Sequence, residues 1–131
     1  MTDDRERWAL ILGGSSGMGQ ATAITLAKAG YNICGIHLDF RAALAHVEEV
    51  KSEIGAAGAE ALYINMNAAD DDRRAAALAT LRERFDRSEA DGRHPYVRVV
   101  MHSLAFGSLV PLVIWLILIA RRLFQLGQGG S

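Results

Sequence analysis

A short apolar run that ends in a glycine-rich loop constrains the fold of this chain more than any other feature. Residues 8–12 are apolar throughout, and glycines follow at positions 13, 17 and 19 in the pattern G-x-x-x-G-x-G. An alanine-rich stretch over 17–29 comes next and has helical spacing. A buried strand that turns through glycines directly into a helix is typical of a parallel α/β sheet.

Strand and helix patterns alternate along the sequence that follows. We predict strands over 32–38, 61–66 and 96–101, separated by helices over 40–54 and from Asp70 onward. The order β-α-β-α-β-α-β specifies parallel strands, right-handed crossovers and helices on both faces of the sheet. The sequence therefore predicts an α/β fold of the Rossmann type.

Each glycine of the loop has a physical task in the binding of a pyrophosphate. Gly13 permits the tight turn, Gly17 lets the backbone approach the phosphates, and Gly19 lets the helix pack closely on the strand. Free N–H groups and the dipole at the helix N-terminus stabilise the phosphate charge. The hydroxyls of Ser15 and Ser16 add hydrogen-bond donors. The loop is therefore a candidate phosphate site.

An acidic residue at the end of the second strand extends this candidate site to a nucleoside. Asp39 lies 20 residues beyond Gly19, where a carboxylate accepts hydrogen bonds from the adenosine ribose. Asp39 would repel a 2′-phosphate, whereas Arg41 would pair with one. We predict a dinucleotide site rather than a merely structural turn, with NAD(H) favoured over NADP(H).

With these residues the chain resembles the short-chain dehydrogenases/reductases. The glycine motif of that family has this spacing and usually follows a threonine, where Leu12 stands here. The resemblance implies that Met18 joins the loop in holding the pyrophosphate. It also implies that Asn67 and Ala68, after the third strand, lie near the adenine.

The end of the fourth strand indicates a branch of that family. Typical members have Asn-Asn-Ala-Gly there, whereas residues 102–106 read His-Ser-Leu-Ala-Phe and resemble the enoyl-acyl-carrier-protein reductases. By this resemblance Ser103 and Leu104 lie against the nicotinamide-side ribose. We interpret His102 as a strand-end residue bonded to backbone rather than as a catalytic group. Hydride transfer to an enoyl thioester or carbonyl is implied, if the full site were assembled.

No catalytic residue can be assigned in this sequence. The family uses a tyrosine that donates a proton and a lysine three residues away, or six in the enoyl reductase branch, after the fourth strand. The lysines here are Lys28 and Lys51, and the tyrosines are Tyr31, Tyr63 and Tyr96, so neither spacing occurs. The alternative function is therefore a catalytically inactive nucleotide-binding or membrane-tethered module.

Composition and charge argue against other functional classes. The net charge is −1 and the arginines are spread along the chain without interleaved aromatics, which does not favour nucleic acid binding. The histidines show no metal-ligand spacing with Cys34, and residues 70–72 are interpreted as acids that complement a helix dipole, so we predict no metal site. A single cysteine and a charged N-terminus without an apolar signal sequence predict a cytoplasmic protein.

An apolar segment near the C-terminus departs from the amphipathic pattern. Residues 109–120 carry no charge, and Arg121 and Arg122 follow. Such a helix must be buried or face lipid, and it is shorter than the about 20 residues of a bilayer span. Three interpretations stay open: a homo-oligomer interface, a membrane-attached helix with the arginines at the headgroups, and a non-native end of a truncated enzyme domain. We predict a dinucleotide-binding domain over 1–110, an apolar helix over 111–124 and a flexible tail over 125–131.

Overall fold

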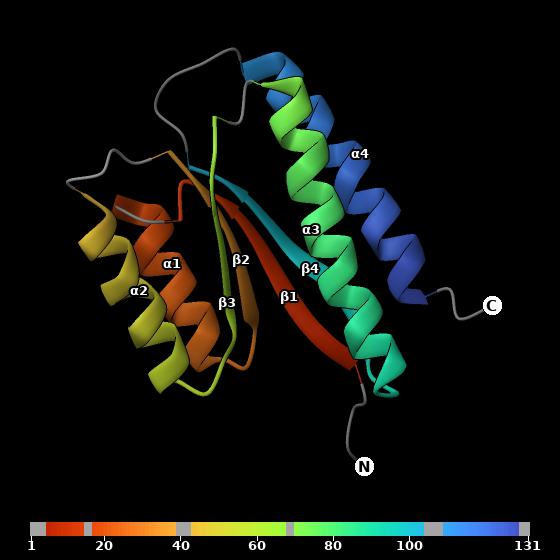
Figure 1. Ribbon diagram of the computed structural model, residues 1–131, viewed down its shortest axis with the longest axis horizontal. Coiled ribbons are helices and arrows are strands. Elements are labelled where there is room, and N and C mark those ends of the chain that lie inside the picture. Colours follow the sequence, from red (N-terminus) through yellow and green to blue (C-terminus); the bar gives the residue numbers. More distant parts are fainter. Residues whose placement is uncertain (1–4, 15–16, 39–42, 68–69, 104–108, 129–131) are drawn as a thin grey trace.

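Four parallel strands form one sheet at the centre of the molecule, and two helices cover each of its faces (Figure 1). The computed structural model describes residues 5–14, 17–38, 43–67, 70–103 and 109–128, with the side chains of 114–125 in the last of these ranges. The α/β fold predicted from the alternating pattern is confirmed.

Strands and helices follow one another in the predicted order. The strands are β1 (Arg5–Leu12), β2 (Asn32–His37), β3 (Ala61–Asn65) and β4 (His94–His102). The helices are α1 (Gly17–Lys28), α2 (Leu44–Ala56), α3 (Asp71–Ala90) and α4 (Leu109–Gln128). β1 and β4 start before the predicted residues, because backbone pairing from Arg5 opposite His94 onward does not need the apolar pattern on which the prediction rested.

The strand order β3-β2-β1-β4 places a crossover between the two halves of the sheet. The chain first adds β2 and β3 on one side of β1, and then returns to pair β4 with the other side of β1. All pairs are parallel, so the carboxyl ends of the strands share one edge. The crevice outside the ends of β1 and β4 is the switch point at which open α/β sheets bind ligands.

The sheet separates two hydrophobic cores. Because side chains alternate along a strand, Leu10 and Leu12 of β1 pack towards α3 and α4, whereas Ala9 and Ile11 pack towards α1 and α2. β1 is therefore buried on both faces, which explains its nearly continuous apolar sequence.

The acids that open α3 cap this helix. Asp70 is the N-cap residue, and its carboxylate accepts a hydrogen bond of 3.0 Å from the backbone N–H of Arg73. Asp71 and Asp72 lie in the first turn, where the helix dipole favours negative charge. These contacts agree with the interpretation of residues 70–72 as helix-start residues.

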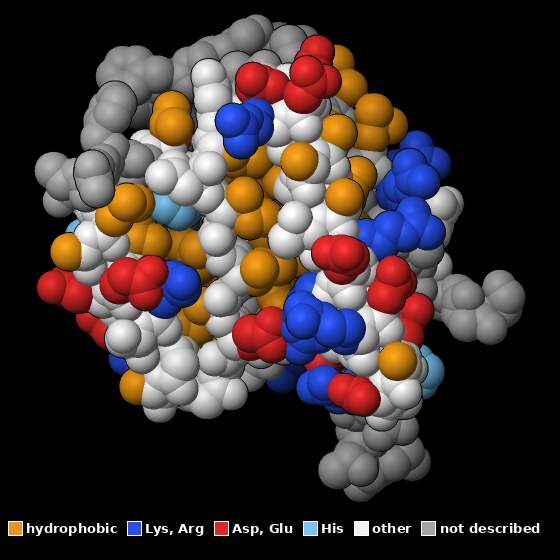
Figure 2. All heavy atoms as spheres, in the orientation of Figure 1, with side chains coloured by type: hydrophobic (Ala, Val, Ile, Leu, Met, Phe, Trp, Pro, Cys, Tyr) orange, Lys and Arg blue, Asp and Glu red, His pale blue; other side chains and the backbone are white. Residues whose placement is uncertain are grey.

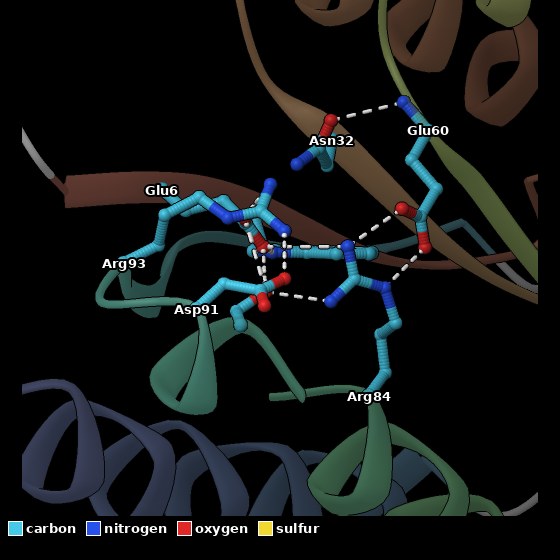
Figure 3. A network of polar contacts seen from close by, with 8 residues as sticks. Glu6, Asn32, Glu60, Arg84, Asp91 and Arg93 are labelled. Carbon is cyan, nitrogen blue, oxygen red and sulfur yellow. Dashed lines mark hydrogen bonds and ion pairs between the residues drawn. The ribbon is translucent and has the colours of Figure 1, made fainter. Parts of the chain in front are cut away.

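A polar cluster around the buried side chains of Glu6, Arg84 and Ser88 fixes the C-terminal end of α3 on the sheet (Figure 3). It lies at the amino ends of the strands, opposite the glycine loop. Glu6 of β1 accepts hydrogen bonds from Ser88 Oγ and pairs with Arg93 at 3.0 Å. Arg84 binds Glu60 through two hydrogen bonds, of 2.6 and 2.7 Å, and donates to Ser88 as well. Figure 2 shows acidic and basic side chains gathered around this end of α3. The cluster joins α3 to the segments that lead into β3 and β4.

Helix α4 packs on the sheet with one face and leaves the other open. Leu116, Ile119 and Leu123 are buried in the core beside α3, whereas the exposed large apolar side chains of the helix are those of Ile114, Ile117, Leu118 and Phe124. The helix is longer at both ends than the predicted range 111–124 and takes in residues 125–128 of the predicted tail. In the described part of the chain, no helix has the combination of length and apolar character that a membrane span needs.

Candidate functional site

The glycine loop after β1 is held in a conformation that requires glycine. Gly13 and Gly17 have φ angles of +88° and +59°, in the left-handed region that residues with a side chain rarely adopt. The N–H of Gly13 donates to the carbonyl of Ile36 at 2.7 Å, so the loop begins as a continuation of the β1–β2 ladder. β1 can therefore turn sharply at the carboxyl edge of the sheet.

Close packing of α1 on this loop depends on Gly19. A Cβ at position 19 would lie 1.9 Å from the carbonyl oxygen of Gly13 and 2.7 Å from its carbonyl carbon. A residue with a side chain therefore cannot be placed there without moving the backbone. The first turn of α1 therefore packs directly against the backbone at the end of β1.

The N-terminus of α1 is suited to an anion. The helix starts at Gly17, so the N–H groups of its first turn have no partner within the helix. Residues 17–20 include no acidic side chain, and Met18 is 74% exposed. Apart from the chain neighbours of Gly17 and the backbone of α1 itself, no described atom lies within 4 Å of the position that a Cβ on Gly17 would take. The described residues thus leave room for a phosphate group where the dipole favours one.

The end of β4 lies beside the start of the loop. Leu12 and His102 are neighbours in the β1–β4 ladder, and the N–H of Ser103 donates to the carbonyl of Leu12 at 2.8 Å. Ser103 is therefore at the switch-point crevice. Nε2 of His102 is buried and has no hydrogen-bond partner among the described residues, so the backbone bond expected for this side chain is not found at that atom.

The residue after β3 expected near the adenine lies at the same edge of the sheet. The N–H of Met66 donates to the carbonyl of His37 at 2.7 Å, and the exposed Asn67 follows. The structure thus brings Gly13, Gly17, Met18, Gly19, Asn67 and Ser103 to one edge. The other predicted site residues, Ser15, Ser16, Asp39, Ala68 and Leu104, lie outside the described residues, as does Arg41.

A contact between Tyr63 of β3 and the glycine loop is a feature that the sequence reasoning missed. Its phenol donates a hydrogen bond of 2.9 Å to the carbonyl of Gly14 in the loop. Burial raises the pKa of Tyr63 above its usual value of 10.0, so the phenol stays a neutral donor. The signal in the sequence is Gly35, an isolated glycine in an apolar strand, which indicates close approach of another group.

Other candidate reactive groups are either buried or distant from the loop. Burial raises the pKa of Cys34 to about 12, so this thiol is not a nucleophile near neutral pH. Arg7 lies 4.7 Å over the ring of Tyr31, and Arg5 lies 5.3 Å over that of Tyr96. Tyr31 directly precedes β2 and Tyr96 lies near the start of β4, so both are away from the glycine loop.

Comparison with known proteins gives a family for most of the sheet. A model of the short chain dehydrogenases matches residues 7–90, which is more than half of the 131 residues. No curated protein sequence is significantly similar to this chain. The family match ends before residues 102–106, on which the resemblance to enoyl reductases rests.

Solved structures share the fold at low sequence identity. A protein of Sinorhizobium meliloti 1021 described as a short-chain dehydrogenase/reductase is 14% identical, with a TM-score of 0.75 over 99% of this chain and 60% of its own. Acetoin dehydrogenase from Enterobacter cloacae is 19% identical, with a TM-score of 0.71 over 92% of this chain and 50% of its own. YwfH, an NADPH-dependent reductase involved in bacilysin biosynthesis, is 19% identical, with a TM-score of 0.71 over 90% of this chain and 49% of its own. The chain thus spans about half to three fifths of the length of these proteins.

Proposed function

This chain belongs to the short-chain dehydrogenase/reductase family, and from that premise we propose that it binds a nicotinamide dinucleotide as the coenzyme half of an oxidoreductase. The observation that carries the proposal is the close packing of Gly19 on Gly13. This contact lies at the N-terminus of α1, beside the switch point between β1 and β4. A tight turn alone would not require this approach of helix to loop.

Residues along the carboxyl edge would each hold one part of the dinucleotide. The loop and the N-terminus of α1 would bind the pyrophosphate, and the residues after β2, β3 and β4 would contact the ribose, adenine and nicotinamide-side ribose in turn. The residues for the pyrophosphate are Gly13, Ser15, Ser16, Gly17, Met18 and Gly19. The ribose would contact Asp39, the adenine Asn67 and Ala68, and the nicotinamide-side ribose Ser103 and Leu104. The nicotinamide, when bound, supplies or accepts a hydride.

The direct test is a titration of the chain with NADH and, separately, with NADPH, followed by nucleotide fluorescence and by calorimetry. We expect NADH to bind more tightly than NADPH, because Asp39 would repel the 2′-phosphate. Asp39→Ala should reduce the difference in affinity between NADH and NADPH. Equal affinities in the wild-type chain would contradict the preference for NAD(H), and a folded chain that binds neither nucleotide would contradict the proposed function.

Two glycines in similar backbone conformations provide a matched pair for this test. Gly17 and Gly58 have φ angles of +59° and +87°, and neither has a described neighbour within 4 Å of its Cβ position. An alanine at either site costs about 1–2 kcal/mol of backbone strain. Only Gly17→Ala should weaken NADH binding, at least tenfold, because only its methyl group enters the space for the phosphates. A similar loss in Gly58→Ala would mean that strain, not the site, is being measured.

The hydride acceptor is a finer part of the proposal. The sequence of residues 102–106 favours an enoyl thioester. Crotonyl-coenzyme A should change the fluorescence of NADH bound to the chain, whereas the saturated butyryl thioester should change it less. Identical responses to both thioesters would contradict this acceptor.

A non-catalytic role is the second candidate, because neither tyrosine–lysine spacing of the family occurs in this sequence. The open face of α4 would then serve binding or assembly. Ile114, Ile117 and Leu118 lie at helical spacing and are 53%, 55% and 60% exposed. A contiguous exposed apolar patch marks an interaction surface. We favour a second copy of this chain as its partner over a membrane surface contacted by Arg121 and Arg122.

A further inference from the structure

A tyrosine from the middle of β3 reaches across β2 to the glycine loop. Ile11, Gly35 and Tyr63 are successive neighbours across β1, β2 and β3 in the ladder. Side chains in such a row lie on the same face of the sheet. The position between Ile11 and Tyr63 is held by the one residue type without a side chain, which leaves the surface of β2 open at this point.

The aromatic ring of Tyr63 occupies the space over Gly35. A Cβ on Gly35 would lie 2.6 to 2.8 Å from three ring carbons of Tyr63, closer than such atoms approach in folded proteins. The ring also lies 5.8 Å from that of His37, with an interplanar angle of 44°. Gly35 and His37 therefore shape the path along which the phenol reaches the loop.

The phenol ends at the backbone of Gly14, the residue after the turn at Gly13. Its oxygen is 2.9 Å from the carbonyl oxygen of Gly14, and a Cβ on Gly14 would lie 3.2 Å from the phenol oxygen. Gly14 is itself buried. One hydrogen bond thus connects β3 to a loop 49 residues earlier in the sequence.

We infer that Tyr63 is a positioning residue for the dinucleotide: by holding the Gly14 carbonyl against the sheet, it preorganises the loop for the pyrophosphate. This inference rests on the proposed function. The bond restrains the backbone at Gly14, directly after the left-handed turn at Gly13. A loop that is already held in its binding conformation loses less conformational freedom when the ligand binds, and this increases the affinity.

Tyr63→Phe isolates the hydrogen bond, because phenylalanine keeps the ring over Gly35. We expect the dissociation constant for NADH to rise about 5- to 10-fold, as for the loss of one such bond. Amide exchange in the loop should become faster without any ligand present. Tyr31→Phe is the matched control, since its ring stacks under Arg7 near the opposite edge of the sheet, and it should leave both quantities unchanged.

Gly35→Ala tests the same contact without removing the phenol. The added methyl group should displace the ring and so weaken NADH binding, although every hydrogen-bonding group is still present. If both substitutions act through one bond, the affinity of the double variant Gly35→Ala/Tyr63→Phe for NADH should fall by less than the product of the two single fold-changes. Additive free-energy losses would overturn the inference.

The outcomes distinguish this inference from the proposed function. A wild-type chain that binds NADH, together with a Tyr63→Phe variant of equal affinity, would overturn the positioning role and leave the function standing. A folded wild-type chain that binds no nicotinamide dinucleotide would overturn both. A loss of thermal stability in Tyr63→Phe with unchanged affinity and loop exchange would identify the tyrosine as a packing residue and overturn the inference.

Discussion

Single residues of the same type play opposite parts in this fold. Gly19 and Gly55 both lie in helices, but a Cβ on Gly19 would overlap the carbonyl of Gly13, whereas a Cβ on Gly55 would have no described neighbour within 4 Å. The first glycine is required by packing. The second leaves backbone freedom in the unfolded chain that an alanine would remove.

This difference predicts opposite changes in stability. Gly55→Ala should raise the free energy of unfolding by up to about 1 kcal/mol, since alanine has the higher helix propensity. Gly19→Ala should lower it by about 1–3 kcal/mol, because the loop or the helix must move to accept the methyl group. Chemical denaturation of the two variants beside the wild-type chain measures both. An equal gain in the two variants would contradict the packing described for Gly19.

At the scale of elements, the cluster around Glu6 and Arg84 determines how α3 is fixed to the sheet. The guanidinium of Arg84 binds the carboxylate of Glu60 with two hydrogen bonds, a geometry that is stronger than a single contact. Glu6 is buried beside it with Ser88 and Arg93 as partners. Because Glu6 and Arg84 are buried, removal of a partner of either residue destabilises more than the contact itself contributes, since a charge is left uncompensated.

The Glu60 carboxylate makes the attachment of α3 sensitive to acid. The hydrogen bond from Arg84, more than any other contact, lowers the pKa of Glu60 below its usual 4.5. A lowered pKa in the folded state contributes stability that is complete above pH 4.5 and is lost as the pH falls through the lower value. The free energy of unfolding should therefore decrease as the pH is lowered from about 4.5.

The substitution Glu60→Gln should reduce the dependence of stability on pH in this acid range. Urea denaturation at pH 7 and at pH 3.5 gives the difference for each variant. Glu89→Gln is the matched control, because this exposed carboxylate on α3 has no ion pair with another described residue, and it should leave the pH dependence as in the wild-type chain. Equal pH dependence in Glu60→Gln and the wild-type chain would show that Arg84 does not stabilise the ionised form.

Over the whole molecule, the features that could be predicted from the sequence are those that depend on residues close together in the sequence. The apolar run of β1 and the spacing of Gly13, Gly17 and Gly19 are local, and they were sufficient for the parallel sheet and the position of the loop. The bond from Tyr63 to Gly14 joins residues 49 apart, and no local pattern encodes such a pair. A similar limit holds for α4, whose sequence is apolar on both faces and whose buried side is decided by its packing on β4 and in the core with α3.

The open face of α4 leads to a prediction about the state of the molecule in solution. If Ile117 and Leu118 pair with a second copy of this chain, sedimentation velocity should show a dimer, and Leu118→Glu should convert it to a monomer. Leu118 is 60% exposed, so the substitution should leave the fold of a single chain intact. Ser52→Glu adds the same charge to an exposed position of α2, on the other face of the sheet, and should leave the dimer in place. A wild-type monomer that floats with anionic phospholipid vesicles would contradict the dimer and favour the membrane surface as partner, because Arg121 and Arg122 would then lie at the headgroups.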